Sequence, residues 1–260
     1  MKIGCCATTA DYLTVKEQGY DCIELSARDL ASVPESEFRD FMTVYRETGF
    51  PCIGFNNFCG AELPLVGPGQ DMAALKDYLS CLCERGKALG IRNIGIGAPA
   101  ARNPPDDWPE ERSDLQMLAF LEMACALTEN SGIRILLEAV NDNACRYLNR
   151  TADAARLLNM LSASNSGLVL DYYHARLMEE EPESLGYAMP LVRHIHVSGG
   201  ERGTARFFFT AADDEEKLRR LRICAFKQHY NGDTVSVEAD RAFLQKDGEC
   251  CRKILGRSWK

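Results

Sequence analysis

The sequence predicts a single (β/α)8 barrel that spans residues 1–260. Short runs of β-branched and other apolar residues alternate with longer segments of helical periodicity, which is typical of strands joined by helices. The chain has 260 residues, and a barrel of this kind usually needs about 250. Eight equal units over that length would each hold roughly 32 residues, which is the size of one strand–helix step.

Eight runs have the length and composition expected of buried strands. They cover residues 2–6, 22–25, 52–56, 93–97, 134–140, 167–171, 194–198 and 235–239. Parallel strands need long crossover connections, and the segments between these runs are long enough to supply them. We therefore expect all eight strands to run in the same direction.

The segments between the strands carry apolar residues at helical spacing. The clearest is 71–90, where leucines recur on one face, Asp71 provides an N-terminal cap and Gly90 provides a stop. Further helices are expected at 10–19, 35–48, 110–130, 151–162, 183–191, 213–226 and 241–255. No linker or low-complexity segment divides the chain, so we expect one domain.

Composition narrows the class of protein. The formal net charge of −8 argues against a nucleic-acid partner, because such proteins usually present a basic surface. No apolar run approaches the roughly 20 residues that a membrane span requires, and nothing at the start resembles a signal peptide. The twelve cysteines are scattered without a CxxC motif, which favours buried thiols in a reducing compartment. We expect a cytoplasmic protein that is either monomeric or a homo-oligomer.

Four of the strand runs carry an acid or a histidine at or near the C-terminal end. They are ILLEAVN with Glu138, LVLDYYH with Asp171, HIHVSGG with His196, and VSVEAD with Glu238. Taken singly, each residue has an ordinary structural alternative. Glu138 and Glu238 could be salt-bridged acids, Asp171 could cap a turn, and His196 could be a hydrogen-bonded core histidine. The carboxyl ends of barrel strands form the catalytic face, so together they predict one divalent ion held at the mouth. This mostly oxygen ligand set favours Mn²⁺, with Co²⁺, Mg²⁺ or Zn²⁺ as alternatives.

Two further histidines lie close to this set. Residues two apart on a strand face the same side, so His194 and His196 both point into the barrel. His196 is nearer the mouth and is the better ligand, whereas His194 is expected to be a core or ligand-orienting group. His174 follows Asp171 by three residues, where its ring could hydrogen-bond a substrate oxygen beside the ion.

Two long loops follow the third and fourth strand candidates. They cover residues 56–70 and 98–111 and are rich in glycine and proline. Because loops after strands lie on the catalytic face, both could cover a substrate, with Phe58 or Trp108 as an apolar wall. The alternative is ordinary surface loops whose aromatic side chains pack on the rim.

The succession of these residues resembles a known superfamily. Glu138 is followed by D-Y-Y-H at 171–174, by H-I-H at 194–196 with Arg202 six residues further on, and by Glu238. This order is similar to that of the sugar phosphate isomerase/epimerase superfamily, a xylose isomerase-like group of TIM barrels that includes the D-tagatose 3-epimerase-like ketose epimerases. The resemblance covers essentially the whole barrel and is strongest from 134 to 240.

The resemblance implies a role for each matching residue. In ketose epimerases, the residues that match Glu138, Asp171, His196 and Glu238 bind Mn²⁺ or Co²⁺, and those that match Glu138 and Glu238 also exchange protons with the sugar. Those that match His174 and Arg202 bind the substrate. The implied function is a divalent-metal-dependent isomerase or epimerase that acts on a small sugar or sugar-like polyol ketone through an enediolate.

The chain also departs from the ketose epimerases where they hold the sugar. They carry an acid six residues after the first ligand, where this chain has Ala144, and a Pro-Gly turn after the arginine, where it reads GTARFFFTAADDEE. We therefore expect weak activity on free ketohexoses. An inosose-type dehydratase, or lyase, and a non-catalytic barrel remain alternatives. An endonuclease IV-like enzyme is a further one, which the acidic charge and the total of four histidines oppose.

Overall fold

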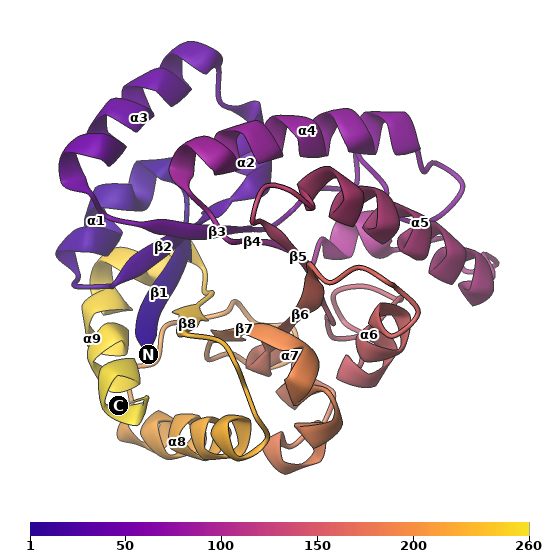
Figure 1. Cartoon of the computed structure of the whole chain (residues 1–260). Helices are drawn as coiled ribbons and strands as arrows, with labels where there is room; N and C mark the ends of the chain where they lie inside the picture. The colour runs from indigo at the N-terminus through magenta and orange to yellow at the C-terminus, as the bar shows by residue number, and fades with distance from the viewer. Residues whose placement is uncertain (260) are drawn as a thin grey trace.

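Eight parallel strands close into a barrel in the order β1-β2-β3-β4-β5-β6-β7-β8, and helices surround it (Figure 1). The computed structural model describes residues 1–259, without the side chains of Ala212 and Asp213. The strands are β1 (Lys2–Ala7), β2 (Cys22–Ser26), β3 (Cys52–Asn56), β4 (Asn93–Ile96), β5 (Arg134–Glu138), β6 (Ser166–Asp171), β7 (Val192–Val197) and β8 (Thr234–Val237). The fold class predicted from the sequence is confirmed, because all eight strand candidates form strands.

The helices lie outside the barrel and connect consecutive strands. They are α1 (Tyr12–Glu17), α2 (Ala27–Ser32), α3 (Glu35–Thr48), α4 (Met72–Leu89), α5 (Glu110–Thr128), α6 (Thr151–Leu158), α7 (Tyr172–Leu177), α8 (Ala212–Lys227) and α9 (Leu244–Ser258). Five 3₁₀ helices occur within the described residues, namely η1 (Thr9–Asp11), η2 (Pro99–Arg102), η3 (Pro182–Tyr187), η4 (Met189–Leu191) and η5 (Arg241–Phe243). Among residues 1–259, no helix is both long and apolar enough to cross a bilayer.

Helix α4 forms where the sequence predicted it and for the predicted reasons. The Asp71 side chain accepts hydrogen bonds from the backbone N–H groups of Ala73 and Ala74, at 2.9 and 3.1 Å, which otherwise have no partner in the first turn. Gly90 ends the helix with φ of 70°, a left-handed conformation that glycine adopts without strain. Between these ends, Leu75, Leu79 and Leu82 are fully buried toward the strands.

The segment between β6 and β7 differs from the prediction. An α-helix at 183–191 is wrong, because η3 and η4 occupy this range and each has a proline in its first two positions, Pro182 in η3 and Pro190 in η4. A proline inside an α-helix removes a backbone donor and clashes with the preceding turn, so the chain forms short 3₁₀ turns instead. The short helices α2 and α7 were not predicted, since six residues are too few to show helical periodicity.

The twelve cysteines are all free thiols, and all except Cys81 and Cys250 are buried or nearly so. Most of them pack as small apolar side chains in the core, as the sequence predicted. Cys6 differs from the others, because it lies on β1 inside the barrel next to polar side chains.

Candidate functional site

Four side chains from four different strand ends converge at the C-terminal mouth of the barrel. One ligand atom from each lies within 4.8 Å of the others. They are Glu138 at the end of β5, Asp171 at the end of β6, His196 on β7 and Glu238 directly after β8. Asp171 and His196 are direct register partners of adjacent strands. The structure thus brings together all four residues that the sequence predicts as ligands, and metal binding by them stays a prediction.

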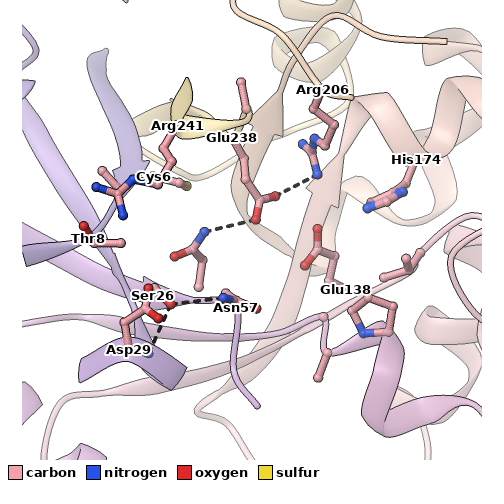
Figure 2. A pocket seen from close by; sticks show the side chains of 17 residues that line it. Cys6, Thr8, Ser26, Asp29, Asn57, Glu138, His174, Arg206, Glu238 and Arg241 are labelled. Atoms are coloured by element: carbon pink, nitrogen blue, oxygen red, sulfur yellow. Dashed lines mark hydrogen bonds and ion pairs between the residues drawn. The ribbon is translucent and has the colours of Figure 1, made fainter. Parts of the chain in front are cut away.

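A cavity of about 400 Å³ opens beside this cluster. Figure 2 shows Glu138, His174 and Arg206 on one side of the cavity, while Thr8 and Asp29 lie on the other. The two sides come from distant parts of the chain and meet because the strand ends form a ring. Hydroxyl, amide and charged groups line much of the cavity, so it suits a small hydroxylated molecule.

The buried carboxylate of Glu24 contacts His196 on the side of the ring that faces the barrel interior. Glu24 lies inside the barrel on β2, with Oε2 at 3.2 Å from His196 Nε2 and Oε1 at 2.6 Å from His194 Nε2. Burial acts to raise the pKa of Glu24, but His194 and His196 outweigh it and hold this pKa well below its usual value. An ionised Glu24 favours a proton on His196 Nε2, which leaves the lone pair of Nδ1 directed toward the other three groups.

Two buried atoms in the cluster have no hydrogen-bond partner among the described residues. They are Glu138 Oε1 and His196 Nδ1, which lie 3.8 Å apart. His196 Nδ1 is also 3.3 Å from Glu238 Oε2, although the geometry is not that of a hydrogen bond. Since buried polar atoms normally have partners, two facing acceptors without one fit a cation between them. The donor set therefore fits a divalent ion such as Mn²⁺.

Gly97 leaves room for the Glu138 carboxylate at the end of β4. A Cβ atom at this position would lie 2.4 Å from Glu138 Oε2, so any other residue would force the carboxylate to move. The close approach of backbone and carboxylate explains a glycine here, and it fixes where the Glu138 oxygens can lie.

Arg206 is the cation that the structure places in the cluster. Its guanidinium donates to Asp171 Oδ2 at 2.6 Å and to Glu238 Oε2 at 3.0 Å, and its Nε donates to Ser198 Oγ at 2.9 Å. The same group lies over the ring of Tyr173, with 4.7 Å between Cζ and the ring centroid. Arg206 therefore offsets part of the negative charge of the cluster.

The two glutamates of the cluster have opposite electrostatic environments. Burial, together with repulsion from Glu238 and Asp171, raises the pKa of Glu138 to about 7 despite the neighbouring His196. Burial would also raise the pKa of Glu238, but Arg206 and His196 outweigh it and hold this pKa well below its usual value. A bound cation would favour the ionised form of both groups.

His174 is neutral and has a defined tautomer. Burial lowers the pKa of His174 to about 4, so the ring carries no charge at neutral pH. Its Nδ1 accepts a hydrogen bond from the backbone N–H of Asn141 at 3.3 Å, and the Asn141 side-chain nitrogen lies 2.6 Å away. The proton therefore belongs on Nε2, and His174 can donate a hydrogen bond to a ligand in the cavity that it lines.

Arg202 does not reach the cavity. Gly199 and Phe207 form an antiparallel bridge that folds residues 199–207 into a hairpin-like loop, with Arg202 near its exposed tip. Arg202 pairs there with Asp142 and donates to the backbone oxygen of Leu177. The chain returns toward the barrel at the base of this loop, so Arg206 enters the cluster instead.

Neither aromatic residue expected as an apolar wall lines the cavity. Phe58 is fully buried against Phe120 and Tyr78, with ring centroids 5.6 and 5.3 Å apart. Trp108 packs under the guanidinium of Arg112 and lines a separate, smaller cavity. The structure therefore does not support the apolar wall, and Phe58 packs deeper than the rim position of the alternative, between helices α4 and α5. The loop after β4 contributes Gly97, Ala98 and Pro99 to the cavity instead.

Sequence reasoning missed Glu24, Cys6, Asn56 and Arg206. Glu24 had a detectable signal, because an acid in the middle of the apolar run CIEL must lie inside the barrel or on the helix side and needs a partner in either place. Asn56 donates from Nδ2 to Glu238 Oε1 at 3.0 Å, across the barrel mouth. No pattern in a single sequence could identify that contact, because 182 positions separate the two residues.

Comparison with known proteins identifies the family. The model of the xylose isomerase-like TIM barrel family matches residues 13–230, so the chain belongs to this family. The superfamily that the sequence resembled is thereby confirmed. A search of curated protein sequences gives no significant match.

Several solved structures share the fold over nearly their full length. D-psicose 3-epimerase from Clostridium cellulolyticum H10, solved with D-tagatose, has a TM-score of 0.78 at 15% identity and covers 100% of both chains. 3-Keto-D-glucoside 4-epimerase from E. coli, YcjR, has a TM-score of 0.73 at 18% identity, with 99% of this chain and 98% of that chain covered. The IOLI protein with a zinc atom has a TM-score of 0.73 at 22% identity, with 99% and 96% covered.

We predict that Glu24→Gln weakens metal binding by roughly 10- to 100-fold, because outer carboxylates orient histidine ligands and raise their basicity. The measurement is a calorimetric Mn²⁺ titration of the metal-free protein. Glu62→Gln serves as the control, since Glu62 is exposed and pairs only with Arg28 and its own loop. Equal Mn²⁺ affinity in the wild type and in a folded Glu24→Gln protein would contradict this role.

Proposed function

We propose that this protein is a divalent-metal-dependent isomerase or epimerase of a small sugar or sugar-like polyol ketone. The observation that carries the proposal is the convergence of three carboxylates and one imidazole within 4.8 Å, beside a cavity at the C-terminal mouth of the barrel whose lining includes hydroxyl, amide and charged groups. Mn²⁺ is the ion that we propose, because the ligand set is mostly oxygen. Solved structures of the same fold include proteins described as sugar 3-epimerases and a keto-glucoside 4-epimerase, which supports a carbohydrate substrate.

Glu138 and Glu238 are the residues proposed to move the proton. Their carboxylates come from the ends of β5 and β8, and both line the cavity (Figure 2). One carboxylate would remove a proton from the carbon beside the substrate carbonyl, and the other would return a proton from the opposite face, which inverts that carbon. A divalent ion bound by the cluster would supply Lewis-acid stabilisation of the negative charge that develops on the substrate oxygens.

Arg206 and His174 are proposed to hold substrate oxygens. The Nε2–H of His174 is a neutral donor, which suits a hydroxyl or carbonyl oxygen, and Arg206 is a fixed cation beside the two carboxylates. This assignment moves the arginine role expected for Arg202 onto Arg206, four residues later. The departures at Ala144 and in the loop after β7 remain the reason to expect a substrate other than a free ketohexose.

The proposal predicts solvent deuterium incorporation at one substrate carbon. The Mn²⁺-loaded protein is incubated in D₂O with free ketohexoses, keto-inositols, keto-glycosides and sugar phosphates, and exchange is followed by NMR in both reaction directions. Glu138→Gln and Glu238→Gln should each slow exchange by roughly 10²- to 10⁴-fold, because an amide cannot accept the proton. Glu201→Gln, on the exposed part of the loop after β7, should leave the rate unchanged. Conversion of a substrate without exchange, in equilibrium and single-turnover runs alike, would contradict proton transfer by two separate carboxylates.

A second prediction separates the two arginines. Arg206→Ala should lower kcat/KM by roughly 10- to 150-fold, because hydrogen bonds to charged groups contribute about 1.5–3 kcal/mol. Arg202→Ala removes an exposed ion pair with Asp142 and a hydrogen bond to the backbone oxygen of Leu177, both away from the cavity, and should change kcat/KM by no more than about twofold. Steady-state kinetics on the best substrate of the panel measure both. A larger loss of kcat/KM in Arg202→Ala than in Arg206→Ala would contradict the assignment and would favour Arg202 as the substrate-binding residue.

A further inference from the structure

A second group of potential ligands lies on the far side of the His196 ring. Cys6 on β1 and Glu24 on β2 join His196, with one ligand atom from each within 4.8 Å of the others. Cys6 Sγ is 3.7 Å from His196 Nε2, and Glu24 Oε2 is 3.2 Å from the same nitrogen. This group uses Nε2 of the ring, whereas the cluster of Glu138, Asp171 and Glu238 faces Nδ1.

These separations fit one small tetrahedral ion. Zinc bonds of about 2.3 Å to sulfur and about 2.0–2.1 Å to nitrogen or oxygen place a sulfur and a nitrogen roughly 3.6 Å apart and a nitrogen and an oxygen roughly 3.3 Å apart. The observed distances are 3.7 Å between Cys6 Sγ and His196 Nε2, and 3.2 Å between His196 Nε2 and Glu24 Oε2. A hydrogen bond between the Cys6 thiol and the His196 ring would also give a distance of 3.7 Å. Such a bond would not require the Glu24 oxygen to lie beside the same ring nitrogen.

The site is reachable from the cavity. Cys6 lines the cavity wall, while Glu24 and His196 lie beneath it and are almost fully buried. An incoming ion would therefore meet the Cys6 sulfur first. Because thiolate ligands select soft or borderline cations, the sulfur distinguishes this group from the oxygen-rich cluster on the other side of the ring.

We propose that Cys6, Glu24 and His196 Nε2 form a second metal site, which takes a thiophilic divalent ion such as Zn²⁺ or Cd²⁺ and competes with the oxygen-rich site for His196. In a neutral imidazole only one of the two ring nitrogens has a lone pair that can bind a metal ion. When the ion binds at Nε2, the proton of that nitrogen moves to Nδ1, and the Cys6 thiol releases its proton to solvent. His196 then presents an N–H instead of a lone pair to Glu138, Asp171 and Glu238, so Mn²⁺ loses its imidazole ligand.

Cadmium absorption tests the site without any substrate. Metal-free full-length protein is titrated with Cd²⁺, and the thiolate-to-cadmium charge-transfer band is followed in the ultraviolet. The wild type should show a saturable band that Cys6→Ser loses and Cys5→Ser retains, since Cys5 is fully buried on the same strand and belongs to no such group. Binding of Cd²⁺ to exposed Cys250 would contribute equally to all three proteins.

Competition is measured by Mn²⁺ titration with and without saturating Cd²⁺. We expect Cd²⁺ to weaken Mn²⁺ binding more in the wild type and in Cys5→Ser than in Cys6→Ser, where Cd²⁺ can compete only by occupying the oxygen-rich site itself. Mn²⁺ binding by Cys6→Ser also shows that this protein is folded, and Cys6→Ala replaces it if it is not. A band of full height in the folded Cys6 variant would overturn the site. Undiminished Mn²⁺ binding in Cd²⁺-saturated wild type would overturn the competition. Neither result depends on whether the protein is an isomerase.

Discussion

The crowding of three carboxylates in a largely buried space is the constraint on which the site depends. Two unit charges about 4 Å apart repel each other by about 4 kcal/mol at an effective dielectric constant near 20, so such a cluster is unstable without nearby cations. Arg206 supplies one positive charge through contacts with Asp171 and Glu238. With all three carboxylates ionised, two negative charges remain, which a divalent ion would balance. Burial, with repulsion from Glu238 and Asp171, raises the pKa of Glu138.

His196 connects this cluster to the interior of the barrel. Each nitrogen of its ring faces a different set of groups, with carboxylates of the mouth near Nδ1 and Glu24 with Cys6 near Nε2. Whatever fixes the proton on one nitrogen therefore determines whether the other can act as a ligand. Glu24 favours the proton on Nε2, because its ionised carboxylate accepts a hydrogen bond from the Nε2–H group of His196 and also contacts His194. The buried pair of Glu24 on β2 and His196 on β7 thus favours a ring orientation in which Nδ1 faces the carboxylates at the mouth.

The sequence predicts those features that depend on local pattern and on the regularity of the barrel. Strand ends of a parallel barrel must meet, so Glu138, Asp171, His196 and Glu238 could be grouped although 100 positions separate the first from the last. Irregular loops follow no such rule. The hairpin-like loop after β7 decides that Arg206 enters the cavity and Arg202 does not, and that choice depends on the contact between Gly199 and Phe207. Contacts inside the barrel, such as that of Glu24 with His196, depend on the packing of distant strands.

The measurement that tests the central claim most directly is anomalous diffraction from a crystal of the protein grown with Mn²⁺. The account predicts one anomalous peak at the barrel mouth, about 2.0–2.6 Å from an atom of each of Glu138, Asp171, His196 and Glu238. It also predicts that the peak contacts Nδ1 of His196, with Nε2 still directed toward Glu24. A crystal in which Mn²⁺ is bound elsewhere, or in which Arg206 alone bridges the carboxylates at saturating Mn²⁺, would contradict it.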